Sequence, residues 1–117
     1  MEFSTFDVVR ILRIGISRLV HWMRGEFIPP GEDRPWGRGY KTAFSTHDLY
    51  NIALFKTCMD FGFTRKFAKM CWQDVEWDKA GEKDYEYILI TKGDYLTFAV
   101  HLVEFKEIVD GIIIERR

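Results

Sequence analysis

The chain has 117 residues, of which 47% are hydrophobic and 30% are charged, and its formal net charge is −1. This composition excludes a disordered polypeptide, and the length allows one domain or a small domain with an appended module. The charge is placed unevenly, since residues 1–70 hold 11 Lys and Arg against 7 Asp and Glu, whereas residues 71–117 hold 6 against 11. A basic N-terminal half is typical of a chain that contacts nucleic acid at that end, although any small domain can divide its charge unevenly.

Two short helices with a tight turn between them are expected at the start of the chain. Thr5 is the predicted N-cap of the first helix, because its hydroxyl can accept from the free backbone amides of the first turn. Residues 13–15 form the turn, and residues 16–25 form the second helix. Helical spacing predicts that the side chains directed toward the interior are Leu19, Trp22 and Met23. The outer face then carries Ser17, Arg18, His21 and Arg24. This segregation suits a DNA recognition helix, but any amphipathic surface helix shows it too.

A glycine- and arginine-rich loop follows the second helix. Pro29 and Pro30 stop that helix, and the glycines after them allow positive φ angles and close backbone approach. We therefore expect residues 31–43 to form a hairpin-like wing. Its cations Arg38 and Lys41 suit contact with a phosphate backbone, although a solvated loop explains them equally well.

Two further helices are expected in the middle of the chain. Ser45 begins the third helix, with Asp48 as its capping-box partner, and this helix runs to Phe61. Thr64 caps the fourth helix. We expect that helix to fade near Trp77, because the residues that follow are polar.

The last third of the chain changes character. Residues 85–91 and 95–100 are rich in β-branched and aromatic side chains, which predicts a β-hairpin. Apolar residues from Leu102 to Ile113 fall at helical spacing and predict a C-terminal amphipathic helix. Gly111 followed by three isoleucines leaves a final strand as an alternative. This last part of the chain either pairs two protomers or closes the core of one.

The sequence contains no motif of catalysis or of metal binding. Cys58 and Cys71 lack the spacing of zinc ligands and are typical of buried thiols in a reducing compartment. His47 and His101 have no ligand-like neighbours in the sequence, and no nucleophile elbow or phosphate-binding loop occurs. We therefore expect neither enzyme activity nor a cofactor. With no signal peptide and no membrane helix in the sequence, we expect a cytoplasmic location.

Five short motifs occur in order between Thr5 and Thr64. They are Leu19-Val20-His21-Trp22, Glu26-Phe27-Ile28, Gly39-Tyr40-Lys41 with Phe44, Ser45 with Asp48-Leu49, and Gly62-Phe63-Thr64. In this order they resemble the winged helix-turn-helix of the mercury-regulator (MerR) family. That family's pattern has a second helix of the form L-R-Y-Y or L-x-x-W, then G-L-I, a wing ending in Y-R-x-Y/F, and a helix ending in G-F/L-S/T.

The resemblance implies binding of double-stranded DNA as a two-fold dimer on a promoter palindrome. Base contacts are implied for Ser17, Arg18 and His21. Phosphate contacts are implied for Trp22, Arg24, Arg38, Tyr40 and Lys41. For Trp22, the residue pattern itself favours packing in the core instead.

The chain departs from the family's pattern at four places. Arg13 stands where the turn usually has glycine, Gly15 where the recognition helix usually has Ser or Thr as its cap, and Val20 where L-R-Y-Y has arginine. The long helix that pairs two family members does not follow Thr64.

We therefore expect an α+β fold, with a MerR-like winged helix-turn-helix in residues 1–78 and a small β-hairpin and helix extension in residues 79–117. The expected function is that of a small, sequence-specific transcriptional regulator that forms a homodimer, with its effector, if any, unknown. One alternative is a protein-interaction module that keeps the fold without binding DNA. Another is an architectural DNA-bending factor of the phage-excision type.

Overall fold

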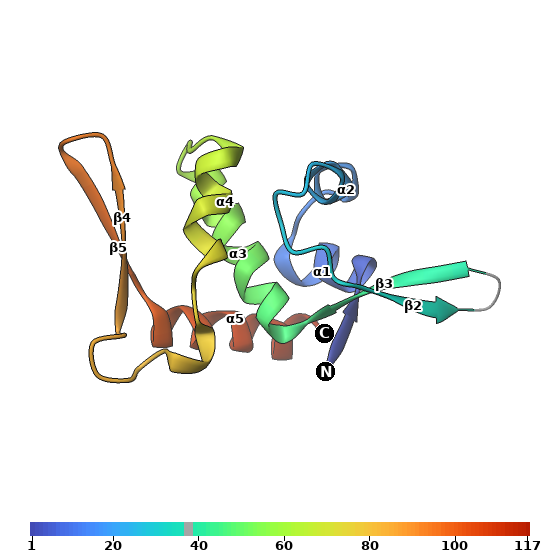
Figure 1. The fold of residues 1–117 in the computed structure, drawn as a ribbon. Helices are drawn as coiled ribbons and strands as arrows, with labels where there is room; N and C mark the ends of the chain where they lie inside the picture. The colour runs from blue at the N-terminus through green and yellow to red at the C-terminus, as the bar shows by residue number, and fades with distance from the viewer. Residues whose placement is uncertain (37–38) are drawn as a thin grey trace.

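The computed structural model describes residues 1–36 and 39–117, and for residues 36, 39 and 40 it describes the backbone without the side chain. The elements follow in the order β1, α1, α2, β2, β3, α3, α4, a short 3-10 turn, β4, β5 and α5 (Figure 1). This part of the chain is a mixed α+β protein with two small antiparallel sheets. Its principal extents are 51 × 28 × 22 Å.

The first sheet has the strand order β1-β3-β2 and includes the predicted wing. It joins β1 (Glu2–Ser4), β2 (Glu32–Trp36) and β3 (Gly39–Ser45), with every pair antiparallel. The hairpin β2–β3 confirms the hairpin expected over residues 31–43. Strand β1 was not predicted, and it pairs Phe3 with Phe44 so that both rings lie in the core.

Helix α1 (Thr5–Leu12) begins one residue earlier than the sequence analysis placed it. Ser4 is its N-cap, because the Ser4 hydroxyl accepts from the Asp7 amide and the Asp7 carboxylate accepts from the Ser4 amide. The prediction of Thr5 as the cap was wrong. Both hydroxyl residues can cap a helix, but the reciprocal capping box needs an acidic group three residues on, and Asp7 stands three residues after Ser4.

The next three helices follow the predicted order. They are α2 (Ile16–Arg24), α3 (Thr46–Asp60) and α4 (Arg65–Gln73). Ser45 caps α3 in a capping box with Asp48, and Thr64 caps α4, as predicted. Helix α4 ends at Gln73 instead of near Trp77. Trp77 lies in a separate 3-10 turn (Trp77–Lys79), because its indole N–H donates to Asn51 of α3 at 2.6 Å.

Helices α1, α2 and α3 end in the same backbone motif. In each, one residue just past the helix has a left-handed conformation: Arg13 (φ 52), Glu26 (φ 59) and Gly62 (φ 88). The amide after that residue then closes a six-residue loop. These closing bonds run from Ile14 to Val9 at 3.2 Å, from Phe27 to Trp22 at 3.0 Å and from Phe63 to Cys58 at 3.1 Å. This is the Schellman motif, in which glycine is the usual left-handed residue.

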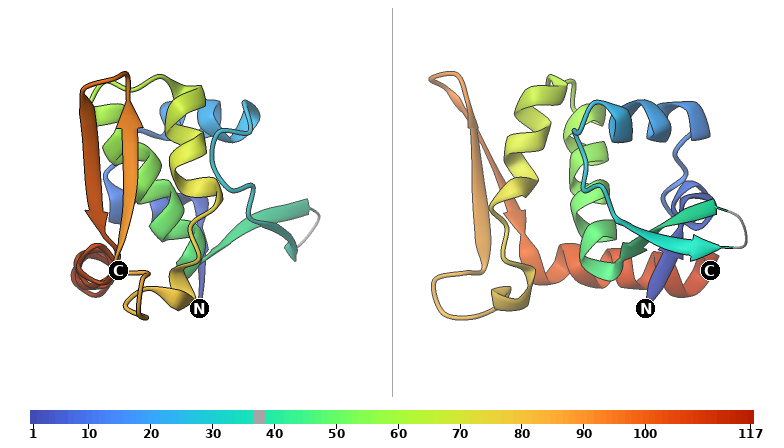
Figure 2. Two further views of the ribbon diagram at one scale, coloured as in Figure 1. Left: turned by 60° about the vertical axis from the view of Figure 1, so that its left-hand side comes forward. Right: turned by 45° about the vertical axis from the view of Figure 1, so that its right-hand side comes forward.

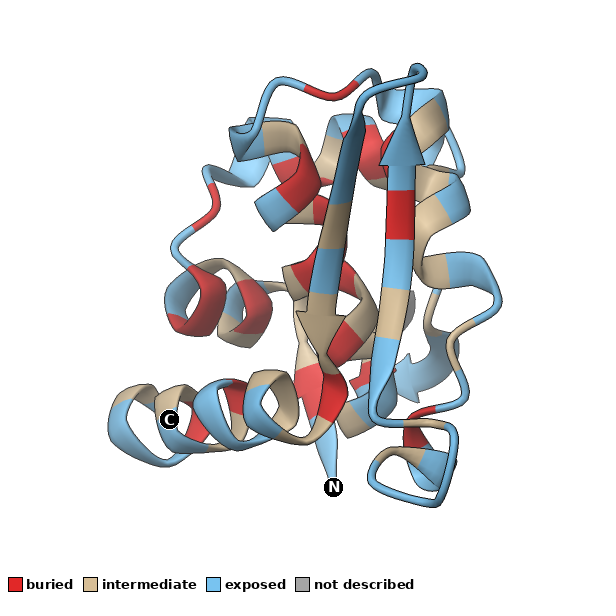
Figure 3. Ribbon diagram, turned by 90° about the vertical axis from the view of Figure 1, so that its left-hand side faces the viewer, coloured by how far each residue is buried: buried red, intermediate tan, exposed pale blue. Residues whose placement is uncertain are grey.

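The C-terminal part forms the predicted hairpin and helix. Strands β4 (Tyr87–Lys92) and β5 (Leu96–His101) pair antiparallel, and α5 (Leu102–Arg116) follows directly. The final strand left open by the sequence is excluded, because the three isoleucines after Gly111 lie within α5. The hairpin is largely exposed, whereas α5 contributes a buried stripe (Figure 3).

Helix α5 lies beneath α1 and α3 and closes the core from that side (Figure 2). One buried cluster contains Trp22, Phe55 and Leu49 together with Leu102 and Val109 of α5. The predicted boundary at residue 78 therefore separates two segments that share a hydrophobic core. None of the helices in residues 1–36 and 39–117 has the length and apolar character to cross a membrane.

Candidate nucleic-acid interface

Helix α2 is anchored through its inner face. Leu19 is fully buried, and Trp22 is 2% exposed with its ring edge-on to Phe55 at a centroid distance of 4.8 Å. Trp22 is therefore a core residue, as the residue pattern favoured. Because almost none of its side chain is exposed, Trp22 is poorly placed to make the phosphate contact that the resemblance implied.

The outer face of α2 is basic and exposed. Ser17, Arg18, His21 and Arg24 are all exposed, and α2 contains no acidic residue. The Arg18 guanidinium lies 4.7 Å from the centre of the Trp22 ring. Stacking of this kind holds the plane of a guanidinium and leaves the N–H groups at its edge able to donate.

The cations of this face have no carboxylate partner in the described part of the chain. Neither Arg18 nor Arg24 forms an ion pair among those residues. Arg24 lies in the last turn of α2, where a positive charge is favoured by the helix dipole. No ion pair within the described ranges therefore neutralises the arginines of α2.

Arg65 of α4 joins this face, which the sequence analysis did not foresee. Its guanidinium donates from Nη1 to Nε2 of His21, 44 residues away, and lies 5.2 Å from the centre of the Phe27 ring. The indole N–H of Trp72, also on α4, donates to the backbone carbonyl of Phe27 at 2.9 Å. These contacts tie both ends of α4 to α2 and to Phe27, which follows it. We call Arg18, His21, Arg24 and Arg65 the basic face.

The wing beside this face carries charges of both signs. Lys41 is exposed and lies opposite Arg34 in the register of β2 and β3. Arg34 pairs with Glu2 at 2.7 Å and with Glu32 at 2.5 Å, and the hydrogen bonds from these two carboxylates raise its pKa. The cation of Arg34 is thus neutralised within the sheet. Arg34 of the wing thus has two carboxylate partners, whereas the arginines of the basic face have none in the described part of the chain.

Two of the predicted wing contacts lie outside what the structure describes. Arg38 falls in the segment that is not described, and for Tyr40 only the backbone, paired with Pro35, is described. Their predicted phosphate contacts stay predictions. Ser17, Arg18, His21 and Arg24 are brought together on one helix, as predicted.

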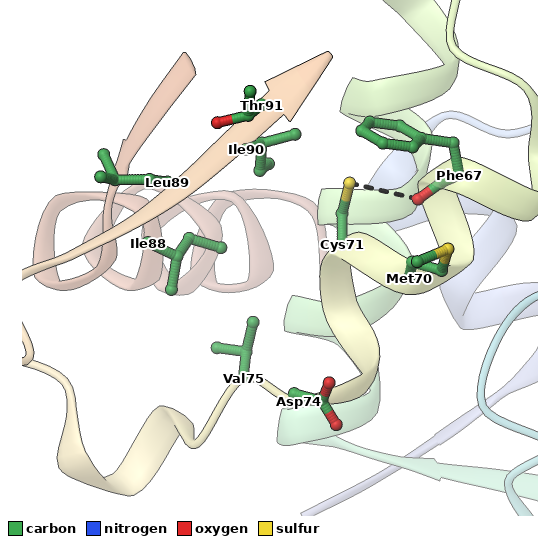
Figure 4. A pocket seen from close by; sticks show the side chains of 9 residues that line it. All are labelled: Phe67, Met70, Cys71, Asp74, Val75, Ile88, Leu89, Ile90 and Thr91. Atoms are coloured by element: carbon green, nitrogen blue, oxygen red, sulfur yellow. Dashed lines mark hydrogen bonds between the residues drawn. The ribbon is translucent and has the colours of Figure 1, made fainter. Parts of the chain in front are cut away.

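An apolar groove lies at the opposite side of α4, between that helix and β4 (Figure 4). Its volume is about 280 Å³, and it is lined by Phe67, Met70, Cys71, Ile88 and Ile90 among others. The Cys71 thiol donates to the backbone carbonyl of Phe67 at 3.3 Å.

The two cysteines lie on neighbouring helices, α3 and α4, and both are free thiols. Burial raises the pKa of Cys58 to about 12 and also raises the pKa of Cys71. Both thiols are therefore protonated and poorly nucleophilic at neutral pH. Within residues 1–36 and 39–117, no three His, Cys, Asp or Glu side chains gather as a metal site would need.

Comparison with known proteins finds no family model that matches the chain and no curated protein similar to it.

Proposed function

We propose that this protein binds double-stranded DNA, with α2 in the major groove and the β2–β3 wing against the backbone. The observation that carries the proposal is the basic face. A short helix presents Arg18, His21 and Arg24 to solvent while Leu19 and Trp22 fix its inner side in the core. Exposed arginines on a rigid helix are suited to hydrogen bonding with guanine edges and with phosphates.

The MerR-like interpretation is supported by two backbone positions. The family pattern has glycine where this chain has Arg13, and G-L-I where it has Glu26-Phe27-Ile28. Both Arg13 and Glu26 adopt the left-handed conformation that favours glycine. Left-handed residues other than glycine at these two positions are what we expect of a chain that kept the family's turn geometry after both glycines were replaced. We therefore propose a small, cytoplasmic transcriptional regulator that acts as a homodimer, with Ser17, Arg18 and His21 reading bases.

The proposal is tested by fluorescence anisotropy with random-sequence duplex DNA across a salt series. Affinity should fall linearly with salt on logarithmic axes, since phosphate contacts release condensed counterions. Arg24→Ala should lower the steepness of that line by about one unit, as loss of one phosphate contact does. Lys83→Ala removes an equal charge at an exposed site in the acidic half of the chain and should leave the line unchanged. Absence of binding by the folded protein at low salt would refute the proposal.

A protein-interaction module is the second candidate, and the outer face of the β4–β5 hairpin favours it. Tyr87 and Leu89 share that face in the register of the two strands, and they are 53% and 71% exposed. Apolar side chains gathered on a two-stranded sheet are a common feature of contact surfaces. If DNA binding is absent, substituting Tyr87 and Leu89 with Ser should alter the sedimentation behaviour of the protein or its capture of a partner.

A further inference from the structure

The contact between His21 and Arg65 determines the protonation of the His21 ring as well as its position. Both residues are exposed, and the ring nitrogen Nε2 of His21 is the atom that meets the Arg65 guanidinium. Arg65 is itself held by three features of α4. It is the first residue after the Thr64 N-cap, its guanidinium packs on the Phe27 ring, and Trp72 ties α4 to the Phe27 carbonyl.

The chemistry of arginine then determines the protonation of the His21 ring. A guanidinium has five N–H donors, no acceptor and no neutral form at ordinary pH, so any hydrogen bond between the two must run from Arg65 to a lone pair on Nε2. The ring that accepts this bond is neutral and carries its proton on Nδ1. Nδ1–H of His21 is therefore a donor that has no hydrogen-bond partner in residues 1–36 and 39–117, and Nε2, the acceptor, is occupied by Arg65.

We propose that His21 reads DNA as a hydrogen-bond donor through Nδ1–H and that Arg65 is the positioning residue that sets this tautomer. The inference rests on the proposed function. In the major groove, guanine presents two acceptors, adenine presents N7, and thymine presents O4, whereas cytosine presents only an amino donor. The base that His21 contacts is thus a purine or thymine, and cytosine is disfavoured at that position.

The tautomer is measured first, on the full-length protein without DNA. Long-range proton–nitrogen NMR spectra of the ¹⁵N-labelled protein, at a pH where the imidazole is neutral, distinguish Nδ1–H from Nε2–H. The chain has three histidines, so His21→Gln assigns the signal. We expect Nδ1–H in the parent and in Lys66→Ala, which removes a neighbouring exposed cation, and loss of that preference in Arg65→Ala. An Nε2–H signal in the parent would overturn the proposal.

Base preference is measured second, on a duplex obtained by sequence selection with the parent protein. Each position is replaced in turn by the other bases, and the position that responds to His21→Ala is the one that His21 reads. Cytosine there should weaken the parent about fivefold, as the loss of one hydrogen bond does. Arg65→Ala should reduce this penalty to less than twofold, and Arg65→Lys, which keeps a donor, should restore it. Lys66→Ala should weaken binding to every sequence alike.

The outcomes separate this inference from the proposed function. Binding by the parent with a cytosine penalty that survives Arg65→Ala would refute the role of Arg65 and leave the DNA-binding proposal intact. No duplex binding at low salt would refute both the proposed function and the reading of bases by His21. In that case an Nδ1–H signal that depends on Arg65 would show that the pair is only structural.

Discussion

The shared motif at the ends of α1, α2 and α3 allows an unusual stability prediction, in which glycine substitutions stabilise the protein. Arg13 and Glu26 occupy the left-handed position at φ 52 and 59, and Gly62 occupies the equivalent position at φ 88. A side chain in this conformation costs about 1–2 kcal/mol, and glycine loses about 0.5–1 kcal/mol more backbone entropy on folding than alanine does. The difference predicts that Arg13→Gly and Glu26→Gly each raise the free energy of unfolding by about 0.5–1 kcal/mol.

The third copy of the motif provides a control of opposite sign. A Cβ atom added at Gly62 would meet nothing within 4 Å, so Gly62→Ala tests the backbone conformation without a steric clash. It should lower the free energy of unfolding by about 1 kcal/mol. Lys66→Gly, at an exposed position in the first turn of α4, should also lower it, by at most about 1 kcal/mol, since glycine is less favourable than lysine in a helix.

The assay is urea unfolding followed by far-ultraviolet circular dichroism, with the four variants compared at a common slope. Arg13 and Glu26 lie in different turns, so their effects should add in the double variant. If Arg13→Gly and Glu26→Gly destabilise the protein as Lys66→Gly does, these residues do not have left-handed backbones. The Schellman ends of α1 and α2, and the support they lend to the MerR-like interpretation, would then be wrong.

Four further predictions follow from contacts in the core and at the first helix cap. Trp22→Ala should cost about 3–5 kcal/mol of stability in the same assay because it empties a fully packed site, and a smaller loss would contradict its burial. Ser4→Ala should cost about 1 kcal/mol whereas Thr5→Ala should cost clearly less; equal losses would mean that Ser4 is not the cap. The Ser4 amide, together with a smaller contribution from the Ser4 hydroxyl, lowers the pKa of Asp7 below its usual 3.8. The carboxylate therefore stabilises the fold above that pH, and this contribution is lost as the pH falls through the folded-state pKa. Ser4→Ala keeps the amide and removes the hydroxyl, so carboxyl NMR titration should show the Asp7 pKa rising in this variant but staying below 3.8. Cys58, whose pKa is raised to about 12, should resist alkylation at pH 8 until the protein is unfolded, and rapid native labelling would contradict its burial.

Elements with local signals were predictable from the sequence. The capping residues Ser45 and Thr64 each act on their immediate neighbours, and the corresponding helices were placed within a few residues. The inward and outward faces of α2 followed from helical spacing alone. Strand β1 was missed because three residues carry too little pattern, and it exists only through its pairing with β3.

The part of the candidate site that depends on tertiary packing was not predictable. Arg65 reaches His21 because α4 packs against α3 and is tied to Phe27, which no local pattern encodes. Its sequence context, an exposed basic residue after a helix cap, is typical of any solvated helix start. The neutralisation of Arg34 by Glu2 likewise required the pairing of β1 with β3.

The contact between the first and last helices has a consequence for biosynthesis. Arg116 donates to the Ile11 carbonyl at 2.8 Å, and Arg10 donates to the Arg116 carbonyl at 3.1 Å. These hydrogen bonds join residues more than 100 positions apart in the sequence and hold α5 against α1. Helix α5, whose Val109 and Ile113 are buried in the shared core, is translated after the other helices and strands of this fold. Residues 5–24 therefore cannot reach their final packing before residue 116 has left the ribosome, and the nascent protein exposes the α5-facing side of α1 until then.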